Sequence, residues 1–316
     1  METISLLSEP GARVDLVVNA GARSGADALA AVREVLLTGG VGDLRTHEVT
    51  SGGGLAEALD RVMTEPPRLL VVGGGDGTVG AAATRVAGTT TVLGVLPLGT
   101  ANDFARTLEL SPDPVVAARE MLGGKIVDLD VGRVNGSAYL NVASFGLSVE
   151  VTRRLTPRLK RFLGPAAYVV ATLRAFRHHR PFAARLEFPA GDQEPLDLDE
   201  LLQVAVGSGR HYGGGNTVSP TASPDDGLLD VYAIVKGRLR DHVSIARLLR
   251  DGSLIEHDQV RHVVTRAVDV VTTVPMPLNL DGELAATTPA AFRVDRNALH
   301  VAVPAWSRAG RLDGGA

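Results

Sequence analysis

The first 125 residues alternate between short, uninterrupted apolar runs and segments whose apolar residues recur at helical spacing. The uninterrupted runs that predict buried strands are residues 14–19, 69–72 and 91–96. Helical spacing is clearest between Ser24, which can cap a helix, and Gly39, which can end it. Strands separated by helices predict a parallel sheet with helices on its faces.

The pattern changes after Lys125, where apolar runs follow one another with few helical stretches between them. The runs that predict further strands are residues 184–188, 202–206, 228–235, 263–271 and 291–294. The turns predicted from residue type are Asn135-Gly136, Asp281-Gly282 and Asn297. Helices are predicted at residues 151–180 and 241–251, so this half is mainly β with helical interruptions.

We therefore predict an α/β plus β fold with two domains. An N-terminal α/β domain with a parallel sheet would cover residues 1–125, and a mainly-β sandwich would cover residues 126–300. Residues 301–316 would form a C-terminal tail that can return to the first domain. A length of 316 residues suits two domains, and a hydrophobic content of 45% is enough for two cores.

Composition excludes several classes of function. The chain has 36 acidic and 32 basic residues and a net charge of −4, which does not favour a nucleic-acid partner. The absence of cysteine excludes disulfides, cysteine-based zinc sites and a cysteine nucleophile. The sequence has no stretch typical of a signal peptide, and no apolar run approaches the roughly 20 residues that span a bilayer. We expect a cytoplasmic protein that contacts membranes only peripherally.

The run GGGDGT at residues 73–78 directly follows one predicted strand and precedes a segment that can begin a helix. Glycines let backbone N–H groups approach an anion closely, and the start of a helix adds a favourable dipole. A carboxylate beside phosphates suits a divalent cation between them, which gives Asp76 a candidate role. A flexible strand-to-helix turn is the alternative interpretation, although Asp76 and Thr78 are not needed for turning.

A second run, PLGTANDFA at residues 97–105, follows the next predicted strand. The N–H groups of Gly99 and Thr100, and the Thr100 hydroxyl, can meet phosphate or ribose. Asn102 and Asp103 fit a helix start, and a capped helix without a ligand would explain this run alone. Two such loops at adjacent strand ends favour a nucleotide crevice.

At these two runs the chain resembles the diacylglycerol kinase catalytic-domain family, particularly its bacterial soluble lipid kinases. Sphingosine and ceramide kinases share that domain. The resemblance extends through a glycine-rich stretch at residues 206–215, a block at residues 219–230 and an acidic turn at residues 280–283. It implies ATP in a cleft between two domains and transfer of its γ-phosphoryl group to a lipid hydroxyl. Diacylglycerol, which would give phosphatidic acid, is the leading acceptor, and phosphatidylglycerol and sphingoid bases stay open.

The two runs and the resemblance together imply a set of site residues. Those assigned to ATP are Asn19, Thr50, Gly74, Gly75, Asp76, Gly77, Thr78, Gly99, Thr100, Asn102 and Asp103. Asp76 would help to position Mg²⁺, and Glu283 would be the general base for the lipid hydroxyl. Asp281 would assist metal binding or orient the base, although a plain Asp-Gly hairpin would also explain this turn. Residues that match a second, structural Mg²⁺ site are Ser223, Asp226 and Leu228.

Two stretches depart from the family's pattern. The family often continues the first run with Asn-Glu, where this chain has Gly80-Ala81. Its first strand usually leads into Asn-Pro, where this chain has Asn19-Ala20. We expect these changes to affect nucleotide affinity more than the type of reaction.

The segment at residues 153–180 contains eight Lys or Arg residues and no Asp or Glu. A basic and apolar stretch in an acidic protein predicts docking to an anionic membrane near the lipid entrance. The alternative is a solvated helix whose charges meet acidic neighbours in the fold. The expected partners are therefore a lipid alcohol and an anionic membrane surface, and a homodimer is compatible with the sequence.

Two other functions compete with a lipid kinase. NAD kinase shares the GGDGT run, but the run at residues 97–105 and the block at residues 226–230 disfavour it. A nucleotide-binding or lipid-binding protein without turnover is the other alternative. The presence of Asp76 and Glu283 disfavours that interpretation, whereas the altered Gly80-Ala81 pair keeps it open.

Overall fold

The computed structural model describes residues 2–9, 11–20, 25–154, 170–171, 174–176, 179–208, 211–212, 216–217, 226–237, 248, 253 and 257–312. The helices in these ranges are α1 (Thr3–Leu7), α2 (Gly25–Thr38), α3 (Gly52–Met63), α4 (Asp76–Val86), α5 (Asp103–Thr107), α6 (Pro114–Leu122), α7 (Leu147–Arg154) and α11 (Arg308–Leu312). The strands of the first half are β1 (Arg13–Asn19), β2 (Asp43–Val49), β3 (Leu69–Gly74), β4 (Val92–Pro97), β5 (Lys125–Val134), β6 (Ser137–Tyr139) and β7 (Val142–Gly146). The later strands are β8 (Phe182–Glu187), β9 (Leu196–Gly207), β10 (His211–Tyr212), β11 (Asn216–Thr217), β12 (Leu229–Val235), β13 (Val260–Thr265), β14 (Ala267–Thr272), β15 (Pro277–Leu280), β16 (Glu283–Thr287) and β17 (Ala290–Val303).

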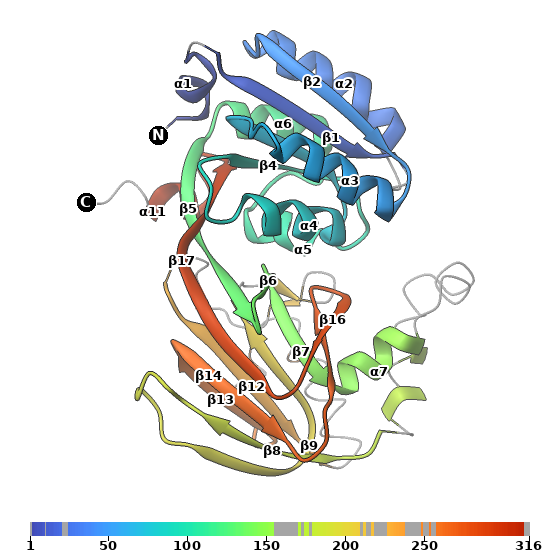
Figure 1. Cartoon of the computed structure of the whole chain (residues 1–316), viewed down its shortest axis with the longest axis vertical. Helices are drawn as coiled ribbons and strands as arrows, with labels where there is room; N and C mark the ends of the chain where they lie inside the picture. Colours follow the sequence, from blue (N-terminus) through green and yellow to red (C-terminus); the bar gives the residue numbers. More distant parts are fainter. Residues whose placement is uncertain are drawn as a thin grey trace.

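The first four strands form a parallel sheet in the order β2-β1-β3-β4, with helices on both faces (Figure 1). Strand β3 is buried along its whole length because its side chains enter two different cores. Leu70 and Val72 pack in the core that contains α3 and α4, whereas Leu69 and Val71 pack in the core that contains α1, α2 and α6. A strand buried on both faces has an uninterrupted apolar run. The predicted α/β architecture is confirmed.

The second half is a β sandwich around a third core, as predicted. Strand β9 is its centre, because it pairs antiparallel with β7, β8 and β12. The largest fully buried side chains of this core include Tyr139, Phe145 and Phe292. These strands alternate between core-facing and other residues, which suits an antiparallel sheet.

Two predicted features of the second half are wrong. The expected strand at residues 263–271 is broken into β13 and β14, which pair with different neighbours. The break lies beyond Thr265, whose buried hydroxyl bonds to Asp192 and to the Ala267 carbonyl oxygen. Asn297 lies in a β-bulge of β17 and not in a turn between strands. Its N–H donates to the buried Asp130 carboxylate at 2.8 Å, which satisfies the bulged backbone.

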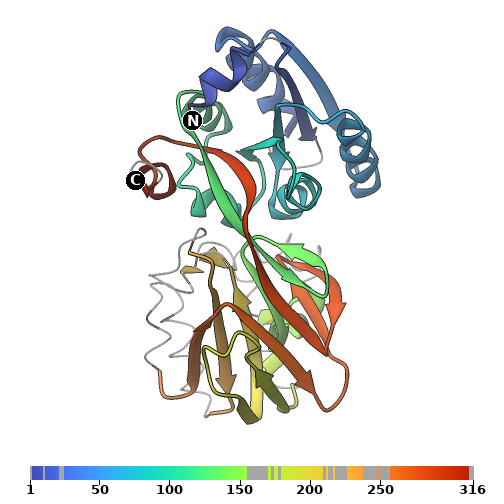
Figure 2. The ribbon, with the colours of Figure 1, turned by 60° about the vertical axis from the view of Figure 1, so that its left-hand side comes forward.

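Strands β5 and β17 run through both halves of the molecule (Figures 1 and 2). They pair antiparallel from Phe292 opposite Val134 to Val303 opposite Lys125. Near its end, β17 also joins the parallel sheet, where Val301 pairs with Leu93 of β4. After β17 the chain stays beside the first sheet, because the Arg308 N–H donates to Glu109. One hydrogen-bonded ribbon therefore connects the two cores.

None of the helices in the described part of the chain is long and apolar enough to cross a bilayer.

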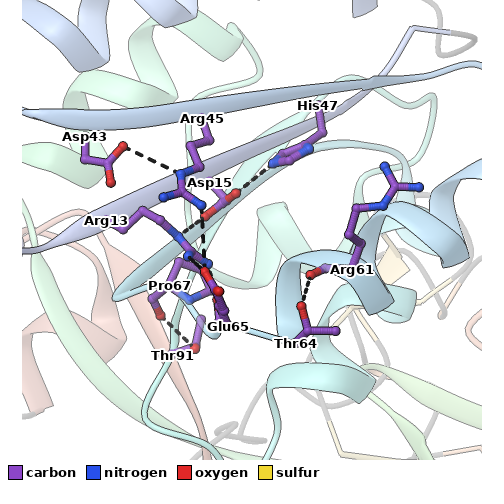
Figure 3. A network of polar contacts seen from close by, with 10 residues as sticks. All are labelled: Arg13, Asp15, Asp43, Arg45, His47, Arg61, Thr64, Glu65, Pro67 and Thr91. Atoms are coloured by element: carbon purple, nitrogen blue, oxygen red, sulfur yellow. Dashed lines mark hydrogen bonds and ion pairs between the residues drawn. The ribbon is translucent and has the colours of Figure 1, made fainter.

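A charged cluster lies at the start of the parallel sheet, and its centre is Asp15 on β1 (Figure 3). Asp15 is only 1% exposed. One of its oxygens lies 2.7 Å from Arg13 Nε, and the other lies 2.7 Å from His47 Nε2. Arg13 also contacts the exposed Glu65 at 3.1 Å. Since the Arg13 guanidinium is largely buried, it depends on Asp15 for compensation of its charge.

We expect Asp15→Ala to reduce the free energy of unfolding by about 3 kcal/mol, because it removes the buried partner of Arg13 and leaves only the exposed Glu65. Urea denaturation of the two proteins measures this difference. Asp43→Ala is the control, since the Asp43–Arg45 contact is 3.7 Å long and half exposed. It should change stability by less than about 0.5 kcal/mol. Equal effects of the two substitutions would contradict the importance of the buried cluster.

Candidate active site

The carboxyl ends of the parallel strands meet at one edge of the first sheet, and the predicted nucleotide residues follow them there. Asn19 ends β1, Thr50 follows β2, and Gly74 ends β3. Residues 75–78 lead from β3 into α4, and residues 99–103 lead from β4 into α5. The crevice outside such strand ends is where open α/β sheets bind ligands.

The two glycine-containing loops touch each other through their backbones. A Cβ atom on Gly99 would overlap the Gly75 Cα atom. The Asn102 side chain fastens the second loop, because it accepts the Gly99 N–H at 2.9 Å and donates to the Gly99 carbonyl oxygen at 3.1 Å. Asn19 Nδ2 donates to Thr78 Oγ1 over 3.3 Å, which links β1 to the first turn of α4. The structure thus brings the two predicted runs together.

Asp76 is the first residue of α4 and lies between these loops. Its Oδ1 atom accepts the Phe104 N–H at 3.2 Å. Burial raises the pKa of Asp76, and the nearby Asp103 carboxylate raises it further. Backbone N–H groups at the start of α5 oppose this rise. Burial and the Asp103 charge therefore destabilise the ionised form of Asp76, and a bound cation would stabilise it.

The acidic residues around Asp76 fit a sparsely ligated Mg²⁺ ion. No group of three or more His, Asp or Glu side chains is arranged to hold a metal within the described ranges. Mg²⁺ in kinases commonly takes only one or two protein carboxylates, and phosphates and water complete its octahedron. Asp76 offers such a carboxylate at the start of α4, with Asp103 adding negative charge beside it.

Glu283 reaches this loop from the second domain. It begins β16, and its Oε1 atom lies 3.0 Å from the position that a Cβ atom on Gly77 would occupy. A cavity of about 250 Å³ opens here and is lined by α4, the β5–β6 hairpin and the β15–β16 hairpin. Asp76, Gly77 and Glu283 all line it. Two carboxylates that are over 200 residues apart in sequence therefore share one cleft.

Asp281 lies in the same β15–β16 hairpin as Glu283, two residues before it, and its partners are backbone N–H groups. Its carboxylate accepts the N–H groups of Leu140 at 2.6 Å, Asn141 at 3.0 Å and Val142 at 2.9 Å. Burial raises the pKa of Asp281 to about 6, although these three bonds favour the ionised form. Since both oxygens are engaged, the geometry favours orientation of the Glu283 hairpin over metal binding.

The residues predicted for the second cation site are only partly described. Ser223 lies outside the described residues. Asp226 accepts the Leu228 N–H at 2.9 Å in a tight turn, and the Gly227 N–H donates to Asp130 at 2.6 Å. Asp130 thus ties this turn to the interdomain ribbon, and the second cation site stays a prediction.

Much of the predicted membrane segment also lies outside the described residues, including residues 155–169. Arg153 and Arg154 are described at the end of α7, and both form ion pairs with Glu150. These pairs match the alternative in which basic residues meet acidic neighbours. Membrane docking by the remaining basic residues stays a prediction.

The sequence did not reveal several residues that form the walls of the cleft. They are Gly80, Ala81, Thr84, Ser137 and Tyr139. The Asn135-Gly136 pair correctly predicted the β5–β6 hairpin, but not that its strand β6 faces α4. That contact depends on how the two halves pack.

Comparisons with known proteins agree with this geometry. The profile of the diacylglycerol kinase catalytic domain matches residues 13–134, and that of the "YegS C-terminal NAD kinase beta sandwich-like domain" matches residues 141–303. A "probable lipid kinase YegS-like" protein of Pseudomonas aeruginosa is 38% identical over 75% of this chain and 77% of its own length. The diacylglycerol kinase of Bacillus subtilis is 29% identical over 82% of this chain and 85% of its own.

Solved structures also resemble this chain. A Bacillus anthracis crystal structure assigned to a diacylglycerol kinase superposes with a TM-score of 0.79, at 25% identity, over 92% of this chain and 95% of its own. The superposition thus covers most of both halves of this chain. This chain belongs to the diacylglycerol kinase catalytic-domain family of ATP-using lipid kinases, with a YegS-type second domain.

Proposed function

We propose that this lipid kinase phosphorylates diacylglycerol to phosphatidic acid with Mg²⁺ and ATP. The observation that carries the proposal is the approach of Glu283 to the first turn of α4, where Asp76 faces the phosphate loops. An alcohol is a weak nucleophile, so a carboxylate beside the phosphoryl donor is the group that the reaction needs. Two similar proteins are named diacylglycerol kinases, which supports diacylglycerol as the acceptor.

Each site residue has a role in this proposal. The loops at residues 74–78 and 99–103, with Asn19 and Thr50, bind ATP. Asp76 holds Mg²⁺, which when bound neutralises charge on the phosphates. Glu283 takes the proton of the lipid hydroxyl as the new O–P bond forms and the bond from the γ-phosphorus to the ADP oxygen breaks.

We also propose a division of labour between the two halves. Residues 1–125 bind the nucleotide, residues 126–300 receive the lipid, and residues 301–316 return to the first domain. The basic segment at residues 153–180 contacts the anionic cytoplasmic face of a membrane, and the structural cation at Ser223, Asp226 and Leu228 stabilises the lipid-binding half. This arrangement lets a water-exposed nucleotide meet an acceptor drawn from a bilayer.

Purified protein with radiolabelled ATP, Mg²⁺ and mixed vesicles tests the function. Label in phosphatidic acid would support the proposal. Label in NAD, offered in a parallel reaction, would identify the NAD kinase alternative. ATP binding without transfer to any lipid would refute a catalytic role.

We expect Glu283→Gln to reduce kcat by about 10²–10⁴-fold, because the amide cannot accept the proton of the hydroxyl. ATP affinity, measured by calorimetry, should stay close to that of the unaltered protein. Glu194→Gln, at an exposed position in the second domain, is the matched control and should keep full activity. A Glu283→Gln protein with normal turnover would refute the assigned base.

Asp76→Asn should raise the Mg²⁺ concentration for half-maximal activity by at least about tenfold, because the neutral amide binds the ion more weakly than the carboxylate. The measurement is a Mg²⁺ titration of initial rates at fixed ATP. Asp199→Asn, on the exposed side of β9, should leave the titration unchanged. An unchanged Mg²⁺ requirement in the Asp76 variant would remove that residue from the metal site.

The buried Asp281 should make stability depend on pH in a defined direction. Its folded pKa of about 6 is above its ordinary value of 3.8, so the protonated form is favoured in the folded state. Relative to Asp281→Asn, the unaltered protein should lose unfolding free energy as pH rises from about 4 to about 6, and the difference should level off above pH 6. Denaturation of both proteins across this range measures it. A gain of relative stability over the same range would mean that the three N–H bonds outweigh burial.

A further inference from the structure

The active-site cavity extends along α4, away from the phosphate loop. Asp76, Gly80 and Thr84 are spaced four residues apart on this helix and all line the same cavity. Each step of four residues advances about 6 Å along a helix. Thr84 is therefore about 12 Å along the axis from Asp76. One end of the cavity lies at the proposed site of phosphoryl transfer, and we call the part beside Gly80 and Thr84 the Gly80 compartment.

Gly80 leaves space in this compartment without any requirement from the fold. It lies within α4 and has no positive φ, so its backbone does not need glycine. A Cβ atom there would meet no other atom within 4 Å. By contrast, a Cβ on Gly94 of β4 would overlap the Met121 side chain, so packing explains that glycine. Glycine inside a helix also lowers helix stability relative to alanine. Neither packing nor helix stability therefore explains why residue 80 is glycine.

The opposite wall of the compartment is also made of small side chains. Ser137 and Ala138 of β6, and Ala285 of β16, line it. The Thr84 hydroxyl donates to the Gly80 carbonyl oxygen at 2.9 Å and keeps lone pairs that can accept a hydrogen bond. The compartment is therefore roomy and partly polar.

The charged side chains among the described residues of the cavity lining are all acidic. Asp76, Asp281 and Glu283 line its inner end, and no Lys, Arg or His is present among the described residues that line it. A phosphodiester headgroup in this space would meet carboxylates and no basic side chain of the described lining, since the Mg²⁺ proposed at Asp76 would already be bound by the ATP phosphates. An uncharged headgroup with hydroxyls meets no such penalty, since carboxylate, hydroxyl and backbone groups can all bond to it.

We propose that Gly80 is a specificity-determining residue that admits an uncharged polyol headgroup beside Glu283. The acceptor range then extends beyond diacylglycerol to neutral glycolipids such as monoglucosyl diacylglycerol. In diacylglycerol the reacting hydroxyl is terminal, so little of the molecule lies beyond it. In a glycolipid the rest of the sugar must lie beside the reacting hydroxyl, and the Gly80 compartment is the adjoining space. This inference rests on the proposed kinase function.

The test compares acceptors that share acyl chains and differ only in headgroup, in neutral detergent micelles with labelled ATP. The acceptors are diacylglycerol, monoglucosyl diacylglycerol and phosphatidylglycerol. We expect the unaltered protein to use the first two, and phosphatidylglycerol with kcat/KM lower by about tenfold or more. Gly80→Asn should lower kcat/KM for the glycolipid by about tenfold, but that for diacylglycerol by less than about threefold. Gly80→Ala should show a smaller loss in the same direction and a higher Tm.

Ala30→Asn is the matched control, because it places the same side chain at an exposed position of α2, outside the cavity. It should leave the ratio between the two acceptors unchanged. An unchanged ratio in Gly80→Asn would overturn the inference, and so would an equal loss on both acceptors with a raised KM for ATP. Use of diacylglycerol but not the glycolipid by the unaltered protein would overturn it while leaving the kinase function intact. Phosphorylation of none of the three lipids would instead refute the proposed function.

Discussion

The pairing of β5 with β17 is the interaction on which the rest of the structure depends. These two strands contribute to the parallel sheet of the first half and to the sandwich of the second, so their ladder of hydrogen bonds connects both cores. The buried Asp130 carboxylate stabilises the bulge within that ladder and also holds the turn at Gly227. A carboxylate on β16 can therefore approach a glycine on α4 without any flexible linker. The cleft is a consequence of a continuous sheet.

Within the cleft, hydrogen bonds from backbone N–H groups hold the carboxylates of Asp76 and Asp281 in place, and burial raises the pKa of both. Asp281 uses both carboxylate oxygens on three successive N–H groups, which fixes the hairpin that presents Glu283. Asp76 accepts backbone N–H groups at the start of α5 and feels the repulsion of Asp103. The acids thus differ in function because their surroundings differ. Asp76, Asp281 and Glu283 all line the cavity. Both Asp281 oxygens are taken up by backbone N–H groups, whereas Glu283 approaches Gly77 of α4.

The glycines of the site are also of two kinds. Gly99 permits two backbones to touch, so its lack of a side chain is required by the fold. Gly80 has open space beside it, and nothing in the fold requires its lack of a side chain. The first kind lets the two loops of the proposed ATP site pack together, and the second leaves open the space that we propose for an acceptor.

Local patterns in the sequence were sufficient to predict the two architectures, because a strand buried on both faces and an alternating strand differ in their periodicity. The same holds for the position of the two glycine-containing loops after β3 and β4, and for the hairpin at Asn135-Gly136. Patterns could not predict that the run at residues 263–271 breaks, since the break depends on a distant partner, Asp192. Nor could they show that Asp281 faces three N–H groups or that Gly80 opens onto a cavity. Those properties depend on contacts between residues far apart in sequence, and only the packing of the two halves along β5 and β17 determines them.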